Sequence, residues 1–121
     1  MQNSSPIILV VEDEVLIRMD VADQLACLGY NTFEASSGQE ALNIIAREGR
    51  VDIVFTDVDM PGKVDGISLA RKVNSDWPTT GIIVTSGQTT ISPDTFPTGS
   101  RFYSKPFNAM KIQTVIEELL A

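Results

Sequence analysis

Residues 7–13 have the sequence IILVVED, in which an uninterrupted apolar run leads directly into two carboxylates. A short continuous run of this kind is typical of a strand buried on both faces, as in a parallel sheet covered by helices. Residues 14–28 then carry apolar side chains at helical spacing. We expect Val15, Met19, Ala22, Leu25, Ala26 and Cys27 of this helix to face the core. The segment therefore predicts a buried strand followed by a helix, with acids at the junction.

The same alternation of strand and helix continues along the chain. A capping box at Ser37 and Glu40 opens the second helical segment. Strands are expected over 30–35, 51–56, 81–85 and 101–104, and helices over 37–49, 65–77 and 108–120. This order predicts an α/β fold, doubly wound, with a five-stranded parallel sheet between two layers of helices. The helix expected between the last two strands should be short or missing, because Pro93 and Pro97 interrupt it.

Length and composition limit the classes of function. The 121 residues predict one domain, 1–121, and the net charge of -7 argues against nucleic acid as a partner. Histidine is absent, which excludes Ser-His-Asp and Cys-His catalysis and a phosphohistidine on these residues. A single cysteine excludes an intramolecular disulfide. No signal-peptide pattern and no apolar run long enough to span a bilayer is present, so we expect a cytoplasmic protein without a membrane partner.

Acidic residues follow two of the predicted strands. Glu12 and Asp13 come directly after the first strand and Asp57 after the third. Carboxyl ends of parallel strands share one edge of the sheet, so these carboxylates should converge there if the two strands are neighbours. Their mutual repulsion requires a cation, and oxygen ligands favour Mg²⁺ or Ca²⁺ over zinc. A site with few carboxylates, leaving room for water and a phosphate oxygen, suits Mg²⁺.

Two other strand ends carry groups that suit a phosphoryl ligand. Thr85 ends the fourth strand with a hydroxyl, and Lys105 follows the fifth with an ammonium group. A metal and a lysine would neutralise phosphoryl charge, while the hydroxyl would bind one oxygen. A carboxylate can act as the nucleophile and form an aspartyl phosphate.

Four motifs in order give the chain a resemblance to a known family. They are VVEDE (10–14), TDVDMPG with a following DG (56–62 and 65–66), VTSG (84–87) and KPF (105–107). The chain resembles the receiver domain of two-component response regulators, over about residues 6–120. The resemblance implies the flavodoxin-like strand order 2-1-3-4-5, which also occurs in the chemotaxis receiver.

The resemblance also implies roles for single residues. Asp57 matches the phosphoacceptor, and Thr85 and Lys105 match the groups that contact the phosphoryl oxygens. The implied Mg²⁺ ligands are Glu12, often through water, Asp13, Asp57 and the backbone carbonyl of Asp59. The implied switch consists of Thr85 and Phe102. The family acts as a phosphoacceptor rather than as an enzyme with turnover, and its donor is a phosphohistidine on a kinase or phosphotransfer protein.

Several features depart from the family pattern. Three residues, 62–64, separate Met-Pro from Asp-Gly, where two are usual. Many members have tyrosine where this chain has Phe102, and Tyr103 should lie on the opposite face of its strand. The chain ends one helix after KPF, so we expect no DNA-binding output domain and a downstream protein target. Two alternatives remain: a phosphorylation-independent scaffold, and a phosphatase of the haloacid-dehalogenase type, which the DVD at 57–59 resembles.

Overall fold

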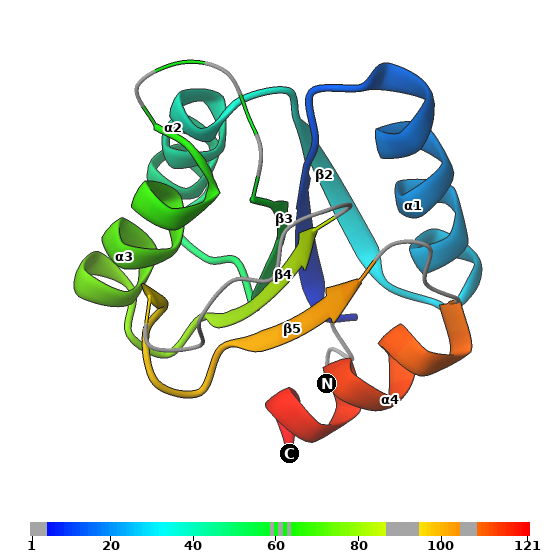
Figure 1. The fold of residues 1–121 in the computed structure, drawn as a ribbon. Helices are drawn as coiled ribbons and strands as arrows, with labels where there is room; N and C mark the ends of the chain where they lie inside the picture. The colour runs from blue at the N-terminus through cyan, green and yellow to red at the C-terminus, as the bar shows by residue number, and fades with distance from the viewer. Residues whose placement is uncertain (1–4, 59, 61, 63, 87–94, 105–108) are drawn as a thin grey trace.

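A parallel five-stranded sheet forms the centre of the molecule (Figure 1). The computed structural model describes residues 5–58, 60, 62, 64–86, 95–104 and 109–121. The strands lie in the order β2-β1-β3-β4-β5, and every neighbouring pair is parallel. They are β1 (Ile7–Val11), β2 (Asn31–Ala35), β3 (Ile53–Asp57), β4 (Gly81–Ser86) and β5 (Arg101–Ser104). The predicted fold class and the strand order implied by the resemblance are confirmed.

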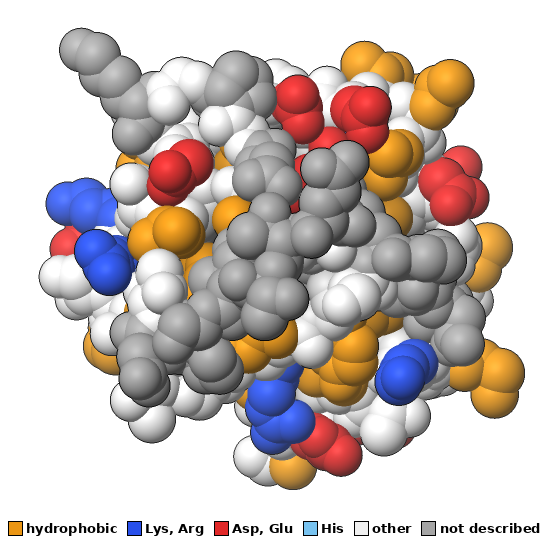
Figure 2. All heavy atoms as spheres, in the orientation of Figure 1, with side chains coloured by type: hydrophobic (Ala, Val, Ile, Leu, Met, Phe, Trp, Pro, Cys, Tyr) orange, Lys and Arg blue, Asp and Glu red, His pale blue; other side chains and the backbone are white. Residues whose placement is uncertain are grey.

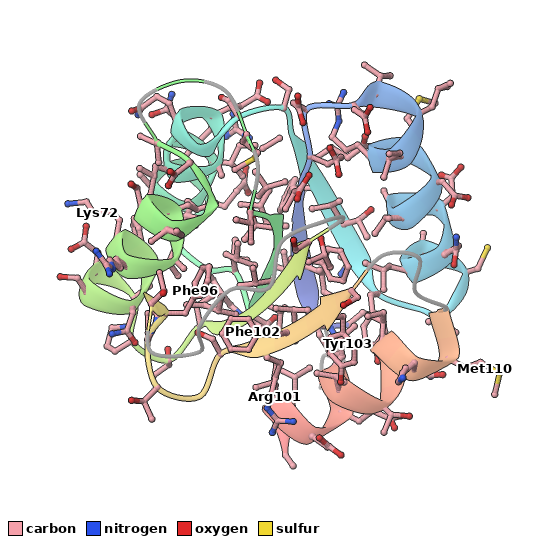
Figure 3. The ribbon with its side chains drawn as sticks, in the orientation of Figure 1. Lys72, Phe96, Arg101, Phe102, Tyr103 and Met110 are labelled. Atoms are coloured by element: carbon pink, nitrogen blue, oxygen red, sulfur yellow. The ribbon has the colours of Figure 1, made fainter. Side chains whose placement is uncertain are left out.

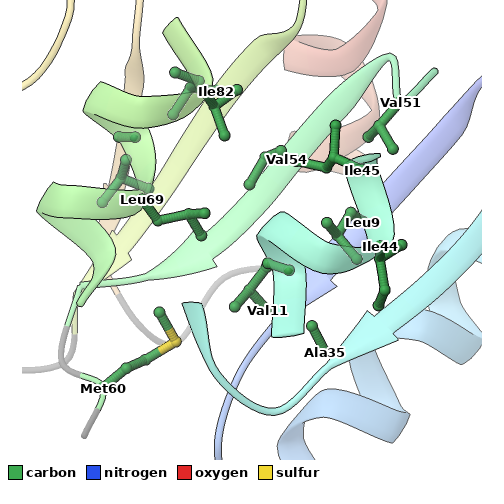
Figure 4. Packing of buried hydrophobic residues seen from close by; sticks show 14 of the residues in the cluster. Leu9, Val11, Ala35, Ile44, Ile45, Val51, Val54, Met60, Leu69 and Ile82 are labelled. Atoms are coloured by element: carbon green, nitrogen blue, oxygen red, sulfur yellow. The ribbon is translucent and has the colours of Figure 1, made fainter. Parts of the chain in front are cut away.

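Helices cover both faces of the sheet, as the alternation predicts. The described helices are α1 (Val15–Cys27), α2 (Gly38–Glu48), α3 (Gly66–Asp76) and α4 (Ala109–Leu120). Helices α2 and α3 pack on one face, and α1 and α4 pack on the other (Figure 1). Alternate side chains of the strands therefore enter two separate cores. Figure 4 shows the core beneath α2 and α3, which includes Leu9, Val11, Val54 and Leu69.

Capping groups fix where the helices begin. The Ser37 hydroxyl accepts a hydrogen bond from the backbone N–H of Glu40 at 3.1 Å, as the capping box predicts. The Glu40 carboxylate accepts from the N–H of Ser36 at 2.6 Å, one residue before the expected position. The Asp65 carboxylate caps α3 by accepting from the N–H of Ser68 at 2.9 Å. Ser37 and Asp65 thus fix where α2 and α3 begin.

The expected inward face of α1 is confirmed at Ala22 and Leu25, which are buried, and wrong at its other positions. Val15 is 53% exposed and Met19 is 49% exposed, and Cys27 is exposed as well. The buried side of the helix consists of Val21, Ala22 and Leu25. Apolar residues lie on nearly every side of this helix, so spacing alone left more than one face compatible with the core. Val15 and Met19, near the start of the helix, therefore form part of an apolar surface that is open to solvent.

The segment between β4 and β5 is described only in part. Residues 95–100 contain turns and no α-helix, while 87–94 lie outside the described residues. For 87–94 the short or missing helix stays a prediction. In the parts of the chain that the structure describes, no helix combines the length and the apolar character needed to cross a membrane.

Candidate functional site

Three carboxylates meet at the carboxyl edge of the sheet. Strands β1 and β3 are hydrogen-bonded neighbours, so Glu12 after β1 and Asp57 at the end of β3 emerge side by side. One oxygen each from Glu12, Asp13 and Asp57 lie within 4.8 Å of one another. Glu12 is 4% exposed and Asp57 is 7% exposed, whereas Asp13 is exposed. The structure thus places together the three acids that the sequence singles out.

The donor set fits a hard divalent cation. Three carboxylates at this separation repel one another strongly where water is partly excluded, and a bound cation removes that repulsion. The described site offers oxygen ligands and no nitrogen or sulfur, a choice that suits Mg²⁺. Figure 2 shows acidic side chains gathered where β1 leads into α1. The exposed Asp13 leaves the site open to solvent on that side.

Hydrogen bonds hold the backbone of Glu12 in place. Its N–H donates to the carbonyl oxygen of Ala35 at 3.0 Å, which extends the pairing of β1 with β2 by one residue. Its carboxylate accepts from the N–H of Glu14 at 3.1 Å. The carbonyl oxygen of Glu12 accepts from the guanidinium of Arg18 at 2.9 Å. These contacts make the first metal-ligand candidate a rigid part of the strand end.

Thr85 lies beside Asp57 on the next strand. The two residues are direct partners in the pairing of β3 with β4, and strand alternation puts their side chains on the same face. Thr85 is 2% exposed, and its hydroxyl lies 3.5 Å from the carbonyl oxygen of Thr56. A hydroxyl donor therefore stands next to the buried carboxylate, as the sequence predicts.

A glycine lets the next helix approach Asp57 closely. Gly66 begins α3, and its N–H donates to the carbonyl oxygen of Val58 at 3.2 Å. A Cβ at this position would lie 2.3 Å from the carbonyl oxygen of Asp57, so only glycine fits. The sequence contains the Asp-Gly pair, but its packing role depends on a distance that no local pattern reveals.

The lengthened loop after Asp57 is anchored in the core. Val58 and Met60 are buried in the cluster under α2 and α3 (Figure 4), and Val64 packs against the same cluster. Val64 lies so close to Gly38 that a Cβ added to Gly38 would lie 2.2 Å from the Val64 carbonyl oxygen. Val64, at the end of the lengthened loop, thus packs against the start of α2. Sequence reasoning noticed the extra residue but missed this contact.

Comparison with known proteins agrees with this geometry. The family model described as response regulator receiver domain matches residues 8–117. The chain belongs to this family. Sensor kinase CckA of Brucella abortus (strain 2308) is 37% identical over 98% of the chain. Sporulation initiation phosphotransferase F of Bacillus subtilis (strain 168) is 31% identical over 93% of this chain and 92% of its own length.

Solved structures give the same result for the fold. A response regulator receiver protein from Sinorhizobium medicae WSM419 superposes with a TM-score of 0.89 at 26% identity, over 96% of this chain and 94% of that one. The chain spans only 13% of the length of sensor kinase CckA. These findings identify a receiver domain of a two-component system, in which the acidic cluster is consistent with the Mg²⁺ pocket of such domains.

The two aromatic residues of β5 point to opposite faces of the sheet. Phe102 is 36% exposed and contacts Phe96 edge to face, with ring centroids 5.1 Å apart (Figure 3). Tyr103 packs against the opposite core, with α1 and α4. The expectation that these neighbours point to opposite sides of the strand is confirmed.

Two predicted site residues lie outside the described residues. Asp59 is one, in the loop after β3, and Lys105 is the other, directly after β5. Strand β5 ends at Ser104, which pairs with Ser86 at the same edge as the acidic cluster. The predictions for Asp59 and Lys105 stay predictions.

Proposed function

We propose that this receiver domain is a phosphoacceptor switch in which Asp57 takes a phosphoryl group from a phosphohistidine of a partner. The observation that carries the proposal is the convergence of the Glu12, Asp13 and Asp57 carboxylates within 4.8 Å at the end of two neighbouring strands. The 121 residues contain no histidine, so the donor histidine lies outside them. A histidine kinase or a histidine phosphotransfer protein has the required chemistry.

The reaction exchanges one bond to phosphorus for another. A carboxylate oxygen of Asp57 forms the new P–O bond, and the P–N bond to the imidazole breaks. The leaving nitrogen keeps the bonding electron pair and takes up a proton. Thr85 binds a phosphoryl oxygen through its hydroxyl, and Lys105 pairs with another, a role that rests on the family resemblance.

The candidate metal ligands are the three clustered carboxylates together with the backbone carbonyl of Asp59. Mg²⁺ held there would neutralise charge on the phosphoryl oxygens. Glu12 and Asp57 are buried, so their positions relative to each other are set by the packed strands. The exposed Asp13 leaves the approach open for the donor.

The start of α1 is proposed as the docking surface for the donor. Val15, Leu16 and Met19 are 53%, 81% and 49% exposed, and the first of them lies two residues beyond Asp13. A partner that delivers a phosphoryl group to Asp57 must cover the rim of the pocket. Burial of the apolar side chains there would stabilise the complex.

The output is proposed to act through the surface around Phe102. When Asp57 is phosphorylated, the Thr85 hydroxyl turns toward the phosphoryl group and Phe102 changes its packing, so that a downstream protein meets a different surface. Phe102 has no hydroxyl with which to bond in either state, and its observed partner is the ring of Phe96. The response is therefore expected to depend on ring packing.

One assay tests the phosphoacceptor proposal. The protein is incubated with Mg²⁺ and acetyl phosphate, and intact mass is followed with time. We expect one added phosphoryl group that is lost in Asp57→Asn and when Mg²⁺ is chelated. An unmodified wild-type protein would instead support the scaffold alternative, and sustained hydrolysis of varied phosphoesters would support the phosphatase alternative.

A second assay tests the docking surface separately. Leu16→Asp should keep the wild-type rate with acetyl phosphate, because Leu16 is not in the pocket. It should lose transfer from a phosphorylated histidine phosphotransfer protein that modifies the wild type. Leu120→Asp is the matched control, since Leu120 is 40% exposed at the far end of α4. Equal loss in both variants would contradict docking at α1.

A further inference from the structure

Arg18 is a largely buried cation beside the acidic cluster. It lies in the first turn of α1, and its side chain is 16% exposed. One guanidinium nitrogen, Nη1, donates to the carbonyl oxygen of Glu12 at 2.9 Å. A second, Nε, donates to the Glu34 carboxylate at 3.3 Å. The side chain therefore links the start of α1 to the ends of β1 and β2.

The carbonyl that Arg18 holds belongs to the peptide between two candidate metal ligands. It joins Glu12 to Asp13, so its orientation sets the direction in which both side chains leave the backbone. The preceding peptide is fixed as well, because the Glu12 N–H donates to Ala35 at 3.0 Å. Both peptides around Glu12 are thus hydrogen-bonded to neighbouring elements.

The positive charge of Arg18 lies close to the candidate metal ligands. A cation near a divalent-metal site disfavours metal binding by repulsion. Glu34 offsets this charge while it aligns the guanidinium plane, whose donors point in fixed directions. Arg18 and Glu34 together hold the backbone of Glu12 through the Arg18 hydrogen bond, and the ion pair adds little net charge near the metal site.

We propose that Arg18, oriented by Glu34, is a positioning residue that preorganises Glu12 and Asp13 for Mg²⁺. This inference rests on the proposed metal site. Groups that orient metal ligands typically contribute about 10–100-fold to metal affinity. Positioning and simple charge effects predict opposite signs here, because loss of the cation alone would tighten Mg²⁺ binding.

The test is calorimetric titration of the full chain with MgCl₂. Arg18→Met keeps side-chain length and removes both hydrogen bonds, and we expect Mg²⁺ affinity to fall by about tenfold or more. Arg18→Lys keeps the charge without the fixed pair of donors and should also bind more weakly than wild type. Glu34→Gln keeps an acceptor for Arg18 and should stay within a few-fold of wild type.

Arg101→Met is the matched control. It removes an arginine that pairs with Glu118 at 2.8 Å, at the start of β5 and away from the acidic edge. Urea unfolding in EDTA shows whether each variant is folded at the titration temperature, and if Arg18→Met is not, Arg18→Lys decides the question. Unchanged or tighter Mg²⁺ binding in a folded Arg18 variant overturns the positioning role of Arg18 and leaves the proposed metal site standing. A wild-type protein that binds no Mg²⁺ overturns both this inference and the proposed metal site.

Discussion

Replacing Gly66 by alanine would insert a methyl group into the backbone that carries Asp57. The added Cβ would lie 2.3 Å from the carbonyl oxygen of Asp57 and 2.7 Å from the Cα of Val58. Ordinary contacts of this kind begin at 3.4 Å, so the start of α3 and the end of β3 must separate by about 1.1 Å. Both contacting groups are main chain, and neither can rotate away.

The cost can be estimated from three effects. Overpacking of this kind costs about 1–3 kcal/mol. Weakening the hydrogen bond from the Gly66 N–H to the Val58 carbonyl costs about 1 kcal/mol more. The better helix propensity of alanine offsets about 0.5–1 kcal/mol. We therefore expect Gly66→Ala to lower the free energy of unfolding by about 1–3.5 kcal/mol.

The same displacement should impair phosphorylation. A shift of about 1 Å in a reacting group can reduce a rate on the order of 100-fold. Acetyl phosphate labelling, followed by mass, measures the rate, and urea unfolding measures stability. Gly81→Ala is the control, because its Cβ would meet side chains of Ile53 and Leu119 at ordinary distances. Wild-type rate and stability in Gly66→Ala would refute the reasoning, and an unchanged rate alone would refute its functional half.

Three further predictions concern other parts of the structure. Gly38→Ala should lower the free energy of unfolding by about 1–3 kcal/mol in urea, because its Cβ would lie 2.2 Å from the Val64 carbonyl oxygen. Asp65→Ala should cost about 1 kcal/mol and Asp65→Asn much less, since asparagine retains the cap; equal losses would contradict capping. Burial raises the pKa of Tyr30 above 10.0, so stability should fall as pH rises above 10. Tyr30→Phe should flatten that alkaline decline, and an unchanged slope would contradict it.

Local patterns were sufficient where one interaction decides the outcome. The apolar run over 7–11 is shorter than a typical helix and so favours a buried strand. Ser37 and Asp65 mark helix starts through hydrogen bonds to groups three residues away. The acidic cluster followed from the rule that parallel strands end at one edge, together with the strand order that the family resemblance implied. It required no knowledge of side-chain contacts.

Long-range contacts were beyond the reach of these patterns. Arg18 and Glu34 are sixteen residues apart, and either could have been a solvated surface residue. The close approach of Gly66 to Asp57 depends on how α3 packs after the loop. In α1, apolar residues on several sides made the periodicity ambiguous, and packing against the sheet and α4 selected the buried face.

The departures from ordinary patterning gather at one edge of the sheet. Glu12, Asp57 and Thr85 are polar and buried there, while Val15 and Leu16 nearby are apolar and exposed. The buried carboxylates lower stability because they repel one another, and the exposed apolar groups add no stability because they stay hydrated. Such local conflicts are expected at functional sites rather than spread through a fold. A cation would relieve the first conflict and a docked protein the second, so one proposal, a phosphoacceptor pocket completed by binding, accounts for both.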